Sequence, residues 1–134
     1  MRAQPRKFTA EEAVPNRRRG GDIRVLLGPA NAGATSGFLG VLTLGPKETV
    51  TEHCHPYSEE FLYVVSGSME VDLDDDPIPL STGDALLVPI GVRHRVRNTG
   101  PDEARAVFHL CPLAPHPSLG HVDTEPLPGA REES

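Results

Sequence analysis

The sequence predicts an all-β domain, built as a sandwich or barrel, and three observations support this fold class. Short runs rich in valine, leucine, isoleucine and tyrosine recur at residues 23–27, 38–44, 60–66, 68–73, 85–89, 93–98 and 104–110. Glycine, proline or aspartate separates these runs, and no segment shows a long helical period. Many short strands joined by such turns are typical of sandwiches and barrels.

The strands follow from the sequence in chain order. Residues 23–27 and 38–44 each end at a Gly-Pro pair, and the small residues 30–37 between them are predicted to form a loop. In residues 68–73, three apolar side chains alternate with two acidic ones, which is the period of a strand with one buried face. Residues 74–77 predict a solvated turn, because no further oxygen ligands follow at the spacing of a calcium loop.

Composition indicates one globular domain and excludes several classes of partner. The chain has 134 residues, enough for one core without disulfides. A net charge of −6 and an aromatic content of only 4% disfavour nucleic acid and anionic membranes as partners. The sequence shows neither a signal peptide nor an apolar run long enough to span a membrane. We therefore expect a cytoplasmic protein in which Cys54 and Cys111 are reduced thiols.

Three parts of the chain differ in character. Residues 1–21 are polar and predict an arm with at most one helical turn, capped by Thr9. Residues 22–113 contain the predicted strands. Residues 114–134 are rich in proline and predict an extended, partly disordered tail in which His116 and His121 are exposed.

Histidines and a glutamate gather around one predicted strand end. His53 and His55 are two residues apart, so in a strand they share a face and can bind one ion. Pro56 interrupts the strand, and Glu60 opens the next one, so that its carboxylate can return to the same pocket. Gly67 then permits a tight turn.

A further histidine, His94, follows a turn that Pro89 and Gly91 predict. A mainly imidazole ligand set favours zinc or iron over magnesium or calcium, although nickel and manganese also accept these ligands. Three or four ligands on rigid strands leave coordination positions open, which is typical of a catalytic metal site.

The two stretches resemble the two sequence motifs of the cupin superfamily. The first motif has two histidines one residue apart, then a glutamate, then six residues and a glycine; it is matched by His53, His55, Glu60 and Gly67. The second motif is matched by Gly83, Pro89, Gly91, His94 and Asn98. The resemblance covers roughly residues 22–112 and implies a double-stranded β-helix, a small jelly-roll barrel with a metal inside one end. The loop between Gly45 and His53 is longer than the family pattern.

The fourth ligand stays open between Glu60 and His109. The last two strands are predicted to pair as a hairpin, in one of two registers. One register places two arginines opposite each other, which is unfavourable. The other brings His109 beside His94 and turns Phe108 out of the barrel, where a second subunit would have to cover it. We therefore expect a homodimer, whose association also protects exposed strand edges.

The run from His53 to Val65, with residues 20–27 and the chain length, resembles the small cupins of bacterial aromatic polyketide pathways, the group of tetracenomycin-type cyclases. This resemblance implies a metal-dependent polyketide cyclase or aromatase with one divalent transition metal per chain, zinc first and iron, nickel or manganese as alternatives. Its substrate would be a poly-β-ketone, free or delivered on an acyl carrier protein, that cyclises by intramolecular aldol condensation.

The candidate catalytic residues are Glu60 and His109. A metal would polarise the carbonyls, and Glu60 would be the general base if His109 is the fourth ligand. If Glu60 is itself a ligand, Glu59 or a bound hydroxide must act as the base. Strand alternation predicts a pocket lined by Phe38, Leu62, Val64, Met69 and Val96.

Three other classes of function remain open. An iron-dependent cupin oxygenase, acting as a dioxygenase or forming quinones, would share the ligand set and accept an aromatic substrate. An isomerase for sugars or keto acids would need cationic side chains inside the barrel, whereas Arg93, Arg95 and Arg97 are predicted to point outward. A non-catalytic binding module is the third class, and the complete ligand set disfavours it.

Overall fold

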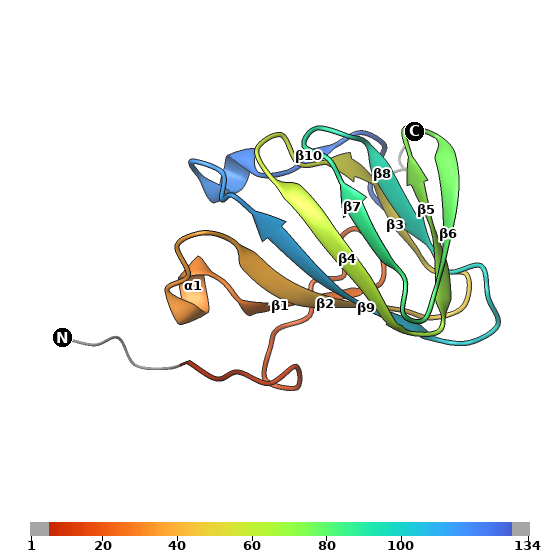
Figure 1. Ribbon diagram of the computed structural model, residues 1–134, viewed down its shortest axis with the longest axis horizontal. Coiled ribbons are helices and arrows are strands. Elements are labelled where there is room, and N and C mark those ends of the chain that lie inside the picture. The colour runs from red at the N-terminus through yellow and green to blue at the C-terminus, as the bar shows by residue number, and fades with distance from the viewer. Residues whose placement is uncertain (1–5, 130–134) are drawn as a thin grey trace.

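Two five-stranded antiparallel sheets face each other in the computed structural model, which describes residues 6–129 (Figure 1). One sheet has the order β1-β2-β9-β4-β7, and the other has the order β10-β3-β8-β5-β6. The elements are β1 (Asp22–Leu27), α1 (Pro29–Ala32), β2 (Phe38–Leu44), β3 (Thr49–Cys54), β4 (Glu59–Ser66), β5 (Ser68–Leu73), β6 (Asp76–Ser81), β7 (Ala85–Val88), β8 (His94–Arg97), β9 (Ala104–Cys111), the 3₁₀ helix Pro117–Leu119 and β10 (Val122–Asp123). The predicted all-β, double-stranded β-helix fold is confirmed.

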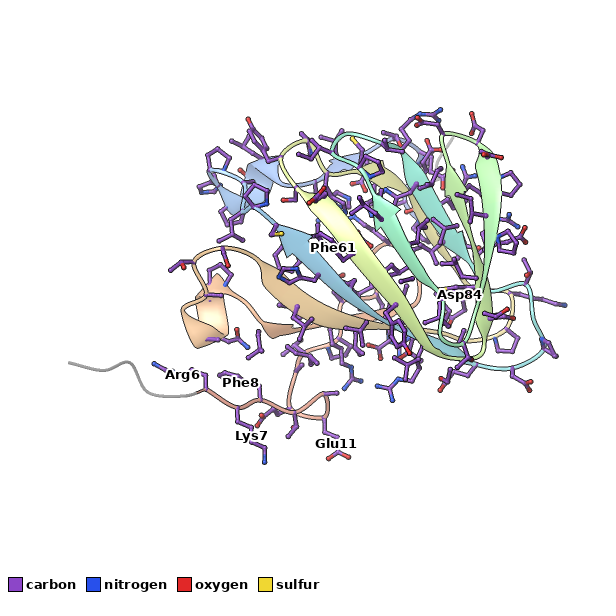
Figure 2. The ribbon with its side chains drawn as sticks, viewed as in Figure 1. Arg6, Lys7, Phe8, Glu11, Phe61 and Asp84 are labelled. Carbon is purple, nitrogen blue, oxygen red and sulfur yellow. The ribbon has the colours of Figure 1, made fainter. Side chains whose placement is uncertain are left out.

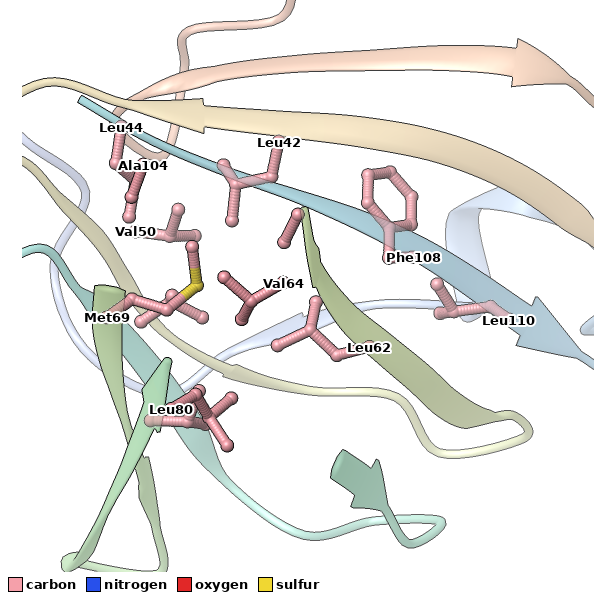
Figure 3. Packing of buried hydrophobic residues seen from close by; sticks show 13 residues of the cluster. Leu42, Leu44, Val50, Leu62, Val64, Met69, Leu80, Ala104, Phe108 and Leu110 are labelled. Atoms are coloured by element: carbon pink, nitrogen blue, oxygen red, sulfur yellow. The ribbon is translucent and has the colours of Figure 1, made fainter. Parts of the chain in front are cut away.

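Alternating side chains fill the space between the sheets. In β4, Glu60, Leu62 and Val64 face inward, whereas Phe61 and Tyr63 face outward. Burial of each large aliphatic side chain stabilises the fold by about 1.5–3 kcal/mol. Figure 3 shows the resulting core, whose buried members are Leu42, Leu44, Val50, Leu62, Val64, Met69, Val71, Leu80, Val96, Ala104, Ala106, Phe108 and Leu110.

Four short elements were not predicted: α1, β6, and the 3₁₀ helix and β10 of the predicted tail. Residues 76–81 form β6, although this run contains Pro77 and Pro79. Proline cannot donate a ladder hydrogen bond, but β6 is the outermost strand of its sheet, where the missing donor faces away from a partner. The predicted loop at residues 30–37 begins with a single helical turn, α1, which Gly33 ends at a positive φ of 70°.

The predicted hairpin between the last two strands is wrong. β8 and β9 lie in different sheets, β8 between β3 and β5, and β9 between β2 and β4. The side chain of Asn98 holds the connection where it crosses over, because it donates to the carbonyls of Leu44 and Asp102 and accepts from the N–H of Gly100. Phe108 therefore points into the core and not outward.

Both flanking segments pack against the barrel. We call residues 114–125 the C-terminal strap; it crosses the end of the molecule where the β3–β4 and β7–β8 connections lie, and β10 pairs with β3 (Figure 1). Arg95 forms an ion pair with Glu125 at 2.8 Å. From the N-terminal side, the carbonyl of Arg19 accepts from the N–H of Thr51, and its guanidinium binds Asp123 at 3.0 Å.

The first described residues lie away from the two sheets, as the labelled side chains of Arg6, Lys7, Phe8 and Glu11 show (Figure 2). Residues 10–13 form a turn with reciprocal Thr9–Glu12 hydrogen bonds rather than a helix. Residues 1–5 of the predicted arm and 130–134 of the predicted tail lie outside the described part. Within it, every helix is too short or too polar to cross a bilayer.

Candidate metal centre

Four buried side chains converge at one end of the barrel: His53, His55, Glu60 and His94. One potential ligand atom of each lies within 4.8 Å of the others. His53 is on β3, directly opposite His94 at the start of β8, and Glu60 is the second residue of β4. His55 lies one residue beyond the end of β3. The structure thus brings together the residues of both sequence motifs.

Hydrogen bonds orient the three imidazoles. His53 and His94 each donate from Nδ1 to the carbonyl of the residue two positions earlier, at 2.8 and 3.1 Å. His55 donates from Nδ1 to the carbonyl of Gly120 in the C-terminal strap, at 3.0 Å. A carbonyl can only accept, so each Nδ1 carries a proton, and in the neutral form of each ring Nε2 presents a lone pair. Metal-binding histidines are typically held in this way.

The arrangement fits a bound cation. Nε2 of His55 and of His94 lie 3.1 and 3.5 Å from the same Oε1 of Glu60. Within residues 6–129, the buried Nε2 of His94 has no hydrogen-bond partner. Leaving a buried polar atom without a partner costs about 1–3 kcal/mol. A divalent transition metal between three imidazoles and one carboxylate would satisfy all four groups.

The charge states of His53 and Glu60 also suit a metal, whereas at His94 a proton competes with a metal for Nε2. Burial lowers the pKa of His53 to about 3, and the neighbouring His94 adds to this effect, so His53 is neutral. Burial alone would raise the pKa of Glu60, but the imidazoles of His55 and His94 outweigh it and hold the pKa well below its ordinary value. Burial alone would lower the pKa of His94, yet the Glu60 carboxylate raises it.

A pocket of about 230 Å³ opens above the four residues. Three of the five predicted lining residues, Phe38, Leu62 and Val96, do line it, whereas Val64 and Met69 lie deeper in the core. Its wall is mainly apolar, and its lining comprises Asn16, Arg19, Ile23, Val25, Phe38, Leu42, Val50, His53, His55, Glu60, Leu62, His94, Val96, Phe108, Leu110 and His121.

The structure does not bring His109 to this centre. The inward positions of β9 belong to Phe108 and Leu110, so His109 points to the outer face of its sheet. There its ring contacts Phe61, with the centroids 6.1 Å apart. The expectation that His109 is a ligand or catalytic residue depended on pairing β9 with β8, and that pairing does not exist. Glu59 likewise alternates away from the inward-facing Glu60.

Sequence reasoning missed His121, which the C-terminal strap carries to the pocket. Its ring stacks on that of His53, with the centroids 4.5 Å apart and the planes 18° apart. The side chain is 20% exposed, whereas the prediction placed it in solvent; His116 is exposed as predicted. No local pattern around residue 121 indicates this position, because it depends on a chain reversal after β9.

Comparison with known proteins identifies the family. A family model described as a cupin domain matches residues 40–110, and the chain belongs to this family. Three Streptomyces proteins are similar over 91% of the chain: SchB of Streptomyces halstedii at 64% identity (88% of that protein), polyketide synthase CurC of Streptomyces cyaneus at 59% (79%), and tetracenomycin polyketide synthase protein TcmJ of Streptomyces glaucescens at 49% (82%).

A solved structure supports the fold. Pac13 from Streptomyces, described as a nucleoside dehydratase, superposes with a TM-score of 0.76 at 19% identity. The match covers 96% of this chain and 98% of that one. At this level of identity, the similarity concerns the architecture alone.

Proposed function

We propose that this chain is a metal-dependent polyketide cyclase or aromatase that promotes intramolecular aldol cyclisation of a poly-β-ketone. The observation that carries the proposal is the joining of one three-histidine, one-carboxylate cluster to a mainly apolar pocket. Relatives at 49–59% identity are named as polyketide synthase proteins, which supports a polyketide as the substrate class.

In this proposal the metal ligands are His53, His55, His94 and Glu60, with zinc as the preferred ion. A bound divalent ion would act as a Lewis acid on the oxygens of a β-diketone unit. Glu60 is then a ligand rather than the general base. The side chain of His109 lies on the outer face of its sheet, so it cannot replace Glu60 as the fourth ligand.

The reaction makes one carbon–carbon bond and releases one water. A methylene carbon between two carbonyls loses a proton, and its electron pair attacks a ketone carbon further along the same chain. The ketone oxygen takes up a proton and leaves as water together with a second proton of the former methylene, so no oxidant is needed. The apolar wall, with Phe38, Leu62 and Phe108, would hold the chain bent for this attack.

The placement of three arginines also supports an apolar substrate; Arg19 does line the pocket, but its guanidinium is paired with Asp123. Arg93, Arg95 and Arg97 lie outside the pocket, on the outer face of the β8 sheet. Arg97 binds Asp72 at 2.8 Å, and Arg93 binds Glu52 at 3.1 Å. Their charges are used to hold strands together, so they do not offer a recognition site for a sugar or keto acid inside the barrel.

The proposal includes a homodimer, but the reason is not an outward-facing Phe108. Phe108 is buried, so it does not call for a second subunit. Instead, the outer face of β4 and β7 exposes four large apolar side chains: Phe61 at 44%, Tyr63 at 49%, Val65 at 47% and Leu87 at 45%. A contiguous apolar patch of this kind typically marks an interface. A second copy of this face would cover it.

The test is metal analysis of the purified protein, followed by turnover of a reactive poly-β-ketone under strict anaerobiosis. The proposal expects about one zinc per chain and undiminished turnover without oxygen, with water as the only small by-product. Turnover that requires oxygen and iron would contradict it and favour the oxygenase.

A further inference from the structure

Residues 120–125 of the C-terminal strap are held beside the candidate metal centre at both ends of this segment. At one end, the carbonyl of Gly120 accepts the hydrogen bond from His55 Nδ1. At the other end, Thr124 Oγ1 donates to the buried carboxylate of Glu52 at 2.8 Å, and the Glu52 N–H donates to Glu125 at 2.6 Å. The residues between these attachments are therefore held over the pocket rather than left in solvent.

His121 lies between the two attachments and is oriented by a chain of charged groups. Its Nε2 is 2.8 Å from Oδ1 of Asp123, and that same oxygen is 3.0 Å from Nε of Arg19. In the described part of the chain, Nδ1 of His121 has no hydrogen-bond partner. One nitrogen thus sets the ring orientation, and the other is left for a ligand in the pocket that His121 lines.

The geometry separates His121 from the metal ligands. A metal lies close to the plane of each imidazole that binds it, but the rings of His53 and His121 are stacked with an interplanar angle of 18°. Two nearly parallel planes that are one ring thickness apart cannot contain the same ion. His121 is accordingly absent from the convergent cluster, although its ring contacts one member of it.

We infer that His121 is a substrate-contacting residue, whose Nδ1 accepts a hydrogen bond from an O–H or N–H group of the molecule bound at the candidate metal centre, with Asp123 and Arg19 as its positioning residues. The inference rests on the proposed function for the identity of that group, which is the enol O–H of a β-diketone. Around the pocket, His121 supplies a polar contact on a wall that is otherwise mainly apolar, which gives orientation to a flexible apolar chain.

The experiment compares two matched substitutions in the zinc-loaded full-length protein. His121→Phe keeps a flat ring on His53 but removes both nitrogens. His116→Phe makes the same change at an exposed histidine of the same strap, whose ring bonds to Ser118. Zinc content and thermal stability are measured for both variants. Two probes are titrated by calorimetry: benzohydroxamate, which anchors to a metal, and benzoylacetone, a small aromatic β-diketone.

The inference expects His121→Phe to weaken benzohydroxamate binding by about tenfold, as for one lost hydrogen bond, while zinc content stays at the wild-type level. His116→Phe should bind as the wild type does. Unchanged benzohydroxamate affinity in His121→Phe would overturn the inference. So would loss of zinc from that variant, because His121 would then support the metal cluster rather than the ligand.

The second probe separates this inference from the proposed function. If the wild type binds benzohydroxamate in a His121-dependent way but does not bind benzoylacetone, the inference stands and the β-diketone substrate class falls. If both probes bind the wild type and His121→Phe equally well, the substrate class stands and the role of His121 falls.

Discussion

Replacing His94 by alanine should abolish most of the stabilisation that zinc gives to this protein. His94 is 1% exposed and is one of the four convergent groups, with its Nδ1 already committed to a backbone carbonyl. Loss of residues that merely support metal ligands costs 10–100-fold in metal affinity, so loss of a ligand itself should cost at least about 100-fold. At free zinc equal to 100 times the dissociation constant, binding stabilises the folded state by about 2.7 kcal/mol. After a 100-fold loss of affinity, the same zinc concentration contributes only about 0.4 kcal/mol.

The assay is thermal unfolding with and without zinc, each variant compared with its own metal-free form. This comparison cancels the cost of the cavity that alanine leaves. For a chain of this length the wild-type zinc shift corresponds to about 10 °C, and His94→Ala should keep about 1–2 °C of it. His109→Ala is the matched control, because this histidine faces outward, and it should keep the full shift. A full zinc shift in His94→Ala, or its loss in His109→Ala, would refute the ligand assignment.

Three further outcomes are expected. Glu60→Gln should reduce the zinc shift as well as turnover; reduced turnover with an unchanged zinc shift would make Glu60 a base instead. Asp72→Asn should lower the free energy of unfolding in urea by about 2 kcal/mol at pH 7, because its carboxylate accepts two hydrogen bonds from Arg97. These bonds lower the pKa of Asp72, so the stability that its carboxylate contributes is present above the ordinary pKa near 4 and is lost as pH falls through the lower pKa of the folded state. The difference in unfolding free energy between the wild type and Asp72→Asn should therefore vanish in strong acid. A difference that does not depend on pH would contradict this. Phe61→Lys should convert the homodimer to a monomer in light scattering, and a monomeric wild type would contradict the interface.

Local patterns alone predicted most of the strands and brought His53 and His55 together, but they left the fourth member of the centre open between Glu60 and His109. A strand has a side-chain period of two, so the spacing of His53 and His55 already placed them on one face. Pro56 and Gly67 marked the strand boundaries, and Gly67 does adopt a positive φ of 74° at the turn between β4 and β5. The motif resemblance added His94. These features are local, because each depends on a few neighbouring residues.

Other features depended on which strands meet, and local patterns do not contain this information. The alternation of side chains shows which residues of β9 share a face of the strand. It does not show whether that face packs against the core or faces solvent. The inward place of Phe108 and the outward place of His109 follow from packing β9 between β2 and β4. The predicted turn at residues 74–77 overlaps the start of β6, whose prolines are acceptable only because this strand lies at the sheet edge.

The sequence by itself determined the β architecture, the family motifs and the three histidines of the centre, His53, His55 and His94. The tertiary structure alone decided that Glu60, not His109, completes that cluster, and that the C-terminal strap returns to place His121 on the ring of His53. The physical reason is the distance along the chain over which each effect acts. Periodicity and turn chemistry act over a few residues, whereas strand order and the path of the strap depend on burial and on ion pairs between segments far apart in the chain, such as Arg19 with Asp123.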